Sequence, residues 1–205
     1  MTASLREIKV YTTFPHRCSY LEGEEATTLF VDPRQKLSQE LYTQLSLLGF
    51  RRSGDHVYRP HCARCNACIA SRVRVEEFEP GRTQRRISRR NADLRVKQSD
   101  SILDDEAYSL YRYYIESRHA DGDMYPRERE QYESFLNDGL GCAIYYRLYQ
   151  GNRLVAVTVA DKMLDGLAAI YSFFDPDQPQ RSLGTEAILL QIREAKAMYL
   201  PFVYL

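Results

Sequence analysis

The sequence lacks the features of a membrane-bound, secreted or disordered protein. None of its apolar runs approaches the roughly 20 residues that cross a bilayer, which excludes a membrane-spanning helix. Its start, MTASLREIKVYTTF, has no apolar segment between a basic tip and a cleavage site, so no secretory signal is predicted. Repeats and low-complexity stretches are absent, and 44% hydrophobic residues exclude disorder. We therefore expect a soluble, cytoplasmic protein whose 205 residues form one large domain or two small ones.

Cysteine is scarce and unevenly distributed. The chain has five cysteines, an odd number that does not suit a disulfide framework, and three of them fall in the run Cys62-Ala-Arg-Cys65-Asn-Ala-Cys68. Thiolates two residues apart can bind one soft cation, so this run offers three metal ligands, and Cys18 is the predicted fourth. Zinc and an iron–sulfur cluster are both open as the bound group, and so is a set of reduced thiols without a metal.

The chain has no net charge, but its charges are not evenly spread. Residues 51–97 carry 13 Arg and Lys against 5 Asp and Glu, and the rest of the chain has the opposite excess. Such a basic segment is typical of a surface that faces a polyanion. Five arginines in it recur at a helical spacing: Arg82, Arg85, Arg86, Arg89 and Arg90. We predict that they contact nucleic-acid phosphates; a solvated helix face paired with the acidic half is the alternative.

The apolar pattern predicts an α+β fold. Residues 1–98 are expected to form a first unit with the cysteines and the basic segment, residues 98–105 a polar linker, and residues 99–205 a second unit. Four helices are predicted: from Asp32-Pro33 to Gly49, over Glu106–Arg118, from Pro126 onward and over Leu183–Met198. Four strands are predicted over Cys142–Tyr149, Leu154–Ala160, Leu167–Phe174 and Phe202–Leu205. In its order of elements, the second unit resembles the GNAT acyltransferases.

Two side chains on the predicted strands are candidates for acid–base chemistry. The carboxylate of Asp161 could hold a substrate ammonium and accept its proton. Tyr171, in the next strand, could deliver a proton to a leaving group. A hairpin flank for Asp161 and core packing for Tyr171 are the alternative interpretations.

The turn between the last long strand and the last helix is a candidate anion site. Backbone N–H groups at a helix N-terminus favour a bound anion, especially beside Arg, Ser and Thr side chains. The residues of this turn that we predict to contact phosphate are Arg181, Ser182, Gly184 and Thr185. An ordinary turn and helix cap is the alternative.

Several motifs taken together resemble one family. They include Cys18-Ser-Tyr-Leu, Gly49-Phe-Arg-Arg-Ser, Tyr58-Arg-Pro, the CxxCxxC run, Arg90-Asn-Ala-Asp-Leu, Arg118-His-Ala-Asp-Gly-Asp-Met and Tyr171-Ser-Phe-Phe-Asp-Pro. From about Phe14 to its last residue, the chain is similar to the bacterial aspartate/glutamate leucyltransferases, relatives of the eukaryotic arginyltransferases. The resemblance implies a GNAT-like aminoacyltransferase domain preceded by a smaller Cys-containing domain. Members continue past the terminal Tyr-Leu, so we expect this chain to lack a short final segment.

The resemblance also implies a reaction and its substrates. Such enzymes transfer leucine from leucyl-tRNA to the N-terminal amine of proteins that begin with Asp or Glu, which creates an N-degron. No organic cofactor is implied. Selecting an acidic N-terminus requires a guanidinium or imidazolium, and the candidates are Arg51, Arg52, Arg59, Arg118 and His119. The arginine stripe and the turn before the last helix would then contact the tRNA.

Three other functions stay open at this stage. An arginyltransferase would use the same chemistry with a different aminoacyl pocket. An acyl-CoA-dependent N-acetyltransferase would need no arginine stripe. A zinc-ribbon nucleic-acid module would use only the cysteines and the stripe, and it would leave the α+β half unexplained.

Overall fold

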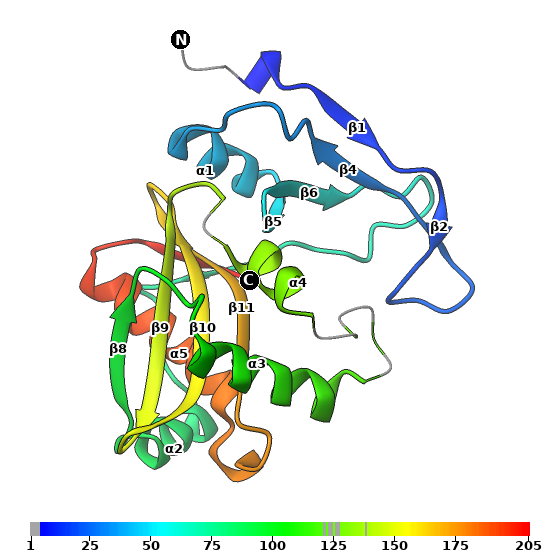
Figure 1. Ribbon diagram of the computed structural model, residues 1–205. Helices are drawn as coiled ribbons and strands as arrows, with labels where there is room; N and C mark the ends of the chain where they lie inside the picture. Colours follow the sequence, from blue (N-terminus) through cyan, green and yellow to red (C-terminus); the bar gives the residue numbers. More distant parts are fainter. Residues whose placement is uncertain (1–4, 121, 123–124, 126–127, 138) are drawn as a thin grey trace.

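The computed structural model describes residues 5–120, 122, 125, 128–137 and 139–205 (Figure 1). Two sheets dominate it, a four-stranded one near the N-terminus and a six-stranded one that carries most of the core. A two-stranded ribbon, β2 (His16–Arg17) with β3 (Glu25–Ala26), extends from the smaller sheet. No helix in the described ranges is long and apolar enough to span a membrane.

The smaller sheet is antiparallel and carries one helix. Its strand order is β1-β4-β6-β5, with bounds Val10–Thr12, Thr28–Val31, His56–Pro60 and Arg51–Ser53 respectively. Helix α1 (Gln39–Leu47) begins at Ser38, whose side chain accepts a hydrogen bond from Leu41 N. The predicted start at Asp32 is wrong, because that carboxylate bonds the backbone and side chain of Arg34 in a local turn. Gly49 ends the helix as predicted, with a φ of +83°.

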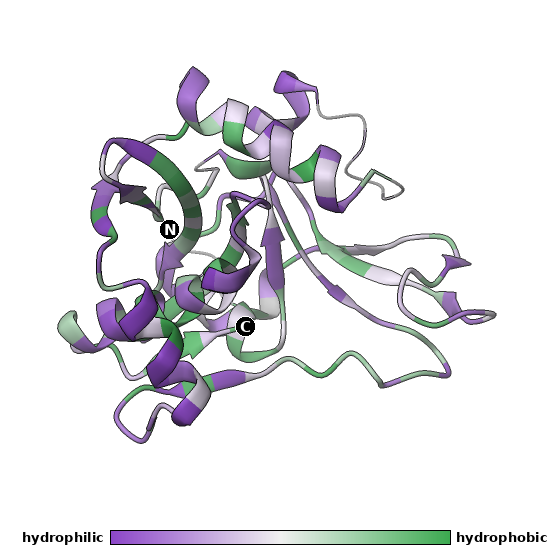
Figure 2. Cartoon of the chain, turned by 90° about the horizontal axis from the view of Figure 1, so that it is seen from below, coloured by the Kyte–Doolittle hydropathy of each residue, from purple (hydrophilic) through white to green (hydrophobic). Residues whose placement is uncertain are grey.

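The larger sheet is covered by helices on both faces. Its strand order is β7-β12-β11-β10-β9-β8, with bounds Arg72–Arg74, Phe202–Tyr204, Gly166–Phe174, Arg153–Lys162, Ala143–Gln150 and Arg95–Ser99. Helices α2 (Arg82–Arg90) and α5 (Leu183–Ala197) contact each other on one face. Helices α3 (Asp105–Arg118) and α4 (Arg129–Leu136) cover the other face (Figure 1). Figure 2 shows both hydrophilic and hydrophobic residues on the helices of the chain, and helix α2 is hydrophilic except at the buried Ile87.

The C-terminal elements agree with the predicted strands and helices within a few residues. The mixed α+β character is confirmed, as are the helix over Glu106–Arg118, the three long strands and the last helix. The predicted helix start at Pro126 lies outside the described residues, and α4 is described from Arg129.

The two sheets are not divided where the sequence pattern suggested. Elements β7, α2 and β8 precede residue 99, yet they belong to the larger sheet and its helical cover. The stretch 98–105 is not a free linker either. Ile102 within it is fully buried, and its carbonyl accepts a hydrogen bond from Tyr132. The change from the smaller to the larger sheet therefore falls between β6 and β7.

Strands β11 and β12 separate after a short paired segment. They run parallel and pair over only three residues of each strand, Gly166–Ala168 against Phe202–Tyr204. Strand β11 then continues to Phe174, while a register irregularity in its pairing with β10 falls opposite Ala169–Tyr171. We call the point where the two strands separate the fork.

Candidate active site

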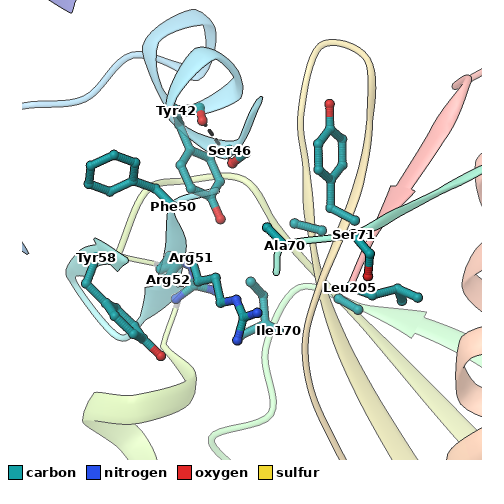
Figure 3. Close-up of a pocket in the computed structure, with 13 residues that line it drawn as sticks. Tyr42, Ser46, Phe50, Arg51, Arg52, Tyr58, Ala70, Ser71, Ile170 and Leu205 are labelled. Atoms are coloured by element: carbon teal, nitrogen blue, oxygen red, sulfur yellow. Dashed lines mark hydrogen bonds between the residues drawn. The ribbon is translucent and has the colours of Figure 1, made fainter. Parts of the chain in front are cut away.

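A cavity of about 190 Å³ lies at the fork, between the two sheets. We call it the fork pocket (Figure 3). Strand β11 supplies one wall, and α1 with β5 and β6 supplies the opposite one. Its lining residues are Tyr42, Ser46, Phe50, Arg51, Arg52, Tyr58, Ala70, Ser71, Ala168, Ala169, Ile170, Tyr204 and Leu205.

The fork pocket combines apolar walls with positive charge. None of its described lining residues is Asp, Glu or His, whereas two are arginines. Arg51 is exposed and forms no ion pair with any residue that the structure describes. Arg51 and Tyr58 lie on one side of the pocket, across from Ala70 and Leu205 (Figure 3). Such a pocket suits an apolar group together with a carboxylate.

Arg52 and Asp161 are brought together, although the sequence suggested different roles for them. Arg52 Nε lies 2.5 Å from Asp161 Oδ2 and Nη2 lies 2.7 Å from Oδ1, with both side chains fully buried. Tyr42 donates a further hydrogen bond to Oδ2 at 2.9 Å. Burial alone would lower the pKa of Arg52, but its hydrogen bonds to Asp161 and the charge of that carboxylate outweigh burial and raise it.

This pair corrects two predicted roles. Asp161 already has a cation and a phenol as partners, so its carboxylate is not free to hold a substrate ammonium. Arg52 also donates to the carbonyls of Gly54 and Asn137, both at 3.0 Å, so four of its five N–H groups are bonded within the protein. Both residues instead join β5 to β10 beneath the fork pocket.

A second cavity, of about 740 Å³, adjoins the fork pocket and shares Arg51 and Tyr58 with it. We call it the cysteine pocket, because the cysteines that line it are Cys18, Cys62, Cys65 and Cys68. Arg59 also lines it, donates to the Leu48 carbonyl at 2.9 Å and lies over the Phe50 ring.

The thiol groups of the cysteine pocket suit a soft cation, but the distances between these side chains do not. The Cys18 sulfur accepts hydrogen bonds from the N–H groups of Tyr20 and Leu21, both at 3.4 Å. Yet no three His, Cys, Asp or Glu side chains among the described residues gather closely enough to hold a metal ion. We therefore derive no catalytic step through a metal.

The predicted residues near the end of α3 form a separate cluster. Tyr171 packs against Phe135, with ring centroids 5.1 Å apart, and against Tyr114. Burial raises the pKa of Tyr171 above its ordinary value. His119 packs on the other side of Tyr114, at 5.3 Å, and Arg118 beside it is exposed. None of these side chains lines the fork pocket, so their predicted roles stay predictions.

Helix α2 displays the predicted arginine stripe. The helix Arg82–Arg90 is confirmed, and the five arginines on it are exposed. Arg181, in contrast, is largely covered, and two of its nitrogens each donate to Asp93 at 2.8 Å. Hydrogen bonds from Arg181 to the Arg90 carbonyl and the Asn91 side chain fasten the turn to the end of α2. Its predicted contact with phosphate is therefore corrected to a structural one.

The other three residues of this turn occupy the start of α5. Ser182 has a left-handed backbone with a φ of 53°, and Thr185 is exposed in the first turn. A Cβ at Gly184 would lie 3.0 Å from the Phe174 ring, so this position fits glycine closely. Their contact with phosphate remains a prediction.

Sequence reasoning missed several residues of the fork pocket. Tyr58 belongs to the Tyr58-Arg-Pro motif of the resemblance, and that motif could have marked it as a site residue. The sequence does not mark Tyr42 and Ile170 as pocket residues, because apolar positions of a helix or strand usually belong to the core.

Two family models match the chain. The one described as "Arginine-tRNA-protein transferase, N terminus" matches residues 16–86, and its C-terminus counterpart matches residues 106–205. Both halves of a tRNA–protein transferase are therefore represented in the chain, and the N-terminal match extends from the smaller sheet through β7 and part of α2.

The matches to curated relatives show which kind of tRNA–protein transferase the chain resembles. The chain is 52% identical to an aspartate/glutamate leucyltransferase of Pseudomonas aeruginosa (strain LESB58) over 201 residues, which cover 98% of this chain and 86% of that protein. The enzymes of that name from Stutzerimonas stutzeri and Alcanivorax borkumensis are 52% and 51% identical and match 98% of this chain, with 86% and 83% of their own lengths covered. The chain belongs to the aspartate/glutamate leucyltransferase family.

One solved structure shows a weaker likeness. The C-terminal domain of a lysylphosphatidylglycerol synthetase from Agrobacterium fabrum matches with a TM-score of 0.49 and 15% identity. The match covers 83% of this chain and 52% of that one. The assignment to the family depends on the sequence matches alone.

Proposed function

We propose that this chain transfers leucine from leucyl-tRNA to the N-terminal α-amine of proteins that begin with Asp or Glu. Its membership of the leucyltransferase family supports the reaction. The observation that carries the proposal is the lining of the fork pocket, which joins apolar walls to a free guanidinium without any described acidic residue. We further propose that the enzyme acts in the cytoplasm, within an N-degron pathway.

The order of elements supports an acyltransferase fold of the GNAT type. Strands β9, β10 and β11 form an antiparallel meander, α5 follows, and β12 returns parallel to β11. This arrangement resembles the GNAT acyltransferases, and in our proposal the donor ester and the acceptor amine meet at the fork. The exposed arginines of α2 and the start of α5 would contact the tRNA.

The pocket supports a leucyl rather than an arginyl donor. The leucine side chain would pack against Ala168, Ala169 and Ile170, which offer only apolar surface. An arginyl side chain would need a carboxylate partner, and here it would meet Arg51. In our proposal Arg51 would instead pair with the carboxylate of an N-terminal Asp or Glu.

The reaction needs positioning more than activation, because an aminoacyl ester is already a reactive acyl donor. The α-amine attacks the ester carbonyl carbon, a C–N bond forms, and the bond to the ribose oxygen breaks. The amine loses a proton and the ribose oxygen gains one. An α-amine has a pKa of about 7.7–8.0, so a useful fraction is neutral near physiological pH without a general base. Tyr171, which follows the pocket residue Ile170 on β11 but does not itself line the fork pocket, stays our candidate for the proton donor.

The four cysteines belong to the proposal as ligands of a soft cation, whose binding would draw them closer together than the structure places them. Cys18 lies on the ribbon β2–β3 and the other three on the loop after β6, so binding would fasten this loop to the ribbon. In that position a metal would stabilise the wall of the cysteine pocket next to Arg51.

The experiment that tests the function is a transfer assay with two donors. Radiolabelled leucyl-tRNA and arginyl-tRNA are each supplied with peptides that begin with Asp, Glu, Ala or Lys. We expect leucine on the Asp and Glu peptides alone. Arginine on those peptides would overturn the choice of donor, and no transfer from either tRNA would overturn the function. Acetyl transfer from acetyl-CoA would support the N-acetyltransferase alternative.

A further inference from the structure

A groove of about 390 Å³ separates α2 from α5, on the face of the larger sheet opposite α3. We call it the α2/α5 groove. Its floor is apolar and includes the half-buried ring of Phe78, and its rim is cationic. The floor residues are Val75, Phe78, Pro80, Leu189 and Ile192, and the rim cations are Arg85, Arg89, Arg193 and Lys196.

The rim is available to an anion. Arg85 and Arg89 are exposed and form no ion pair within the described part of the chain. Arg193 and Lys196 pair with Glu186 at 2.6 Å and with Glu76 at 3.5 Å, but neither carboxylate lines the groove. The rim of the groove therefore carries more positive charge than the neighbouring carboxylates of the protein neutralise. An apolar floor with a cationic rim is complementary to a nucleotide, whose base is flat and whose phosphate is anionic.

The groove is connected to the fork pocket by an edge strand. Ser71, just before β7, lines the fork pocket, and Val75, just after it, lines the groove. Four residues of extended chain span about 13 Å, which is the length of about four stacked nucleotides at roughly 3.4 Å each. Strand β7 is the outermost strand of its sheet, and the exposed guanidinium of Arg72 adds positive charge along it, whereas that of Arg74 pairs with Glu77 at 2.8 Å.

We propose that the α2/α5 groove holds an unpaired nucleotide at the base of the single-stranded 3′ end of tRNA. This inference rests on the proposed function, since it places the terminal aminoacyl ester at the fork. The base stacks on Phe78, and Arg85 and Arg89 contact the adjoining phosphates. The strand then passes around the edge of β7 to the fork pocket.

The first test is a binding measurement on Phe78→Ala, a substitution that changes no charge. Its affinity is compared for uncharged leucine tRNA and for the same tRNA trimmed of its single-stranded 3′ nucleotides. We expect the variant to bind intact tRNA roughly tenfold more weakly than the wild type does, and trimmed tRNA equally well. Unchanged binding of intact tRNA, or an equal loss for both tRNAs, would overturn the proposal.

A matched pair of exposed substitutions covers the case in which Phe78→Ala fails to fold. Arg85→Ala with Arg89→Ala removes two cations from the rim, whereas Arg82→Ala with Arg86→Ala removes two from the same helix outside the groove. We expect only the first pair to abolish the preference for intact tRNA. The second pair should weaken binding of both tRNAs alike, because contacts with phosphates are lost. The salt dependence of binding should also become smaller. Equal behaviour of the two pairs would contradict the assignment.

Competitors identify the occupant. We expect a single-stranded oligonucleotide with the sequence of the 3′ end to displace tRNA from the wild type but not from Phe78→Ala. Displacement by an acidic peptide and not by the oligonucleotide would overturn the proposal in favour of a protein partner, and displacement by mononucleotides alone would favour a free nucleotide. Because binding is measured without transfer, an inactive enzyme that keeps these preferences would refute the proposed function and leave the groove assignment intact.

Discussion

The guanidinium of Arg52 and the carboxylate of Asp161 face each other at 2.5 and 2.7 Å, and this buried pair joins the smaller sheet to the larger one. The adjacent residue, Arg51, is the exposed cation of the fork pocket. The pair therefore fixes the distance between the cationic wall of the pocket and its apolar wall on β11. A role in positioning follows, without direct contact with substrate.

Breaking the pair should destabilise the protein strongly. Asp161→Asn leaves the buried Arg52 charge without its partner, and such a loss costs about 3–5 kcal/mol. Urea unfolding of the wild type and the variant measures this difference. The control is Arg52→Met combined with Asp161→Leu, which removes both charges and should lose less than Asp161→Asn does. A loss below about 1 kcal/mol for the single variant would contradict a tight buried pair.

Asp32 should give the fold a measurable acid dependence. Hydrogen bonds from Arg34 lower the pKa of Asp32 to about 2, against roughly 3.9 in an unfolded chain. A lowered pKa stabilises the folded state at pH values above about 4, and this contribution is lost as the pH falls through about 2. We expect the stability difference between the wild type and Asp32→Asn to shrink from pH 5 to pH 2. A constant difference over that range would rule out the linkage.

The cysteine pocket yields a prediction that separates a metal site from a set of reduced thiols. Protein purified without chelator is expected to contain zinc or iron, and Cys65→Ser with Cys68→Ser should lose it. The matched control is Cys142→Ser, because Cys142 does not line this pocket. Elemental analysis gives the metal content, and thermal unfolding shows whether the loop is destabilised. Metal-free wild-type protein with unchanged stability after chelation would refute the site.

The larger sheet could be predicted from the sequence to a considerable extent, and the site only in part. The nearly continuous apolar runs at Leu154–Ala160 and Leu167–Phe174, each bounded by a turn signal, indicate buried strands. The short strands β7 and β12 offered less, because three residues carry little periodicity and their pairing joins distant parts of the chain. For that reason the predicted boundary at residue 98 lies between the two family-model matches but does not separate the two sheets.

The error about Asp161 has a physical cause. An acidic residue after an apolar run is consistent with a free catalytic carboxylate and with a buried, paired one, and only the tertiary structure shows that Arg52 lies opposite it. Arg51 and Arg52 are adjacent in the sequence and look equivalent there. Because successive side chains of a strand point to opposite faces, β5 buries one and exposes the other. Sequence reasoning could name the pair but not choose between its members.

The central claim, that Arg51 selects an acidic N-terminus, is tested most directly by one selectivity ratio. The ratio of kcat/KM for a peptide beginning with Asp to that for the same peptide beginning with Asn is measured in the wild type and in Arg51→Ala. We predict that the ratio falls by about tenfold or more in the variant while the KM for leucyl-tRNA is unchanged, since only the contact with the carboxylate is removed. A ratio that stays at the wild-type value would contradict the account.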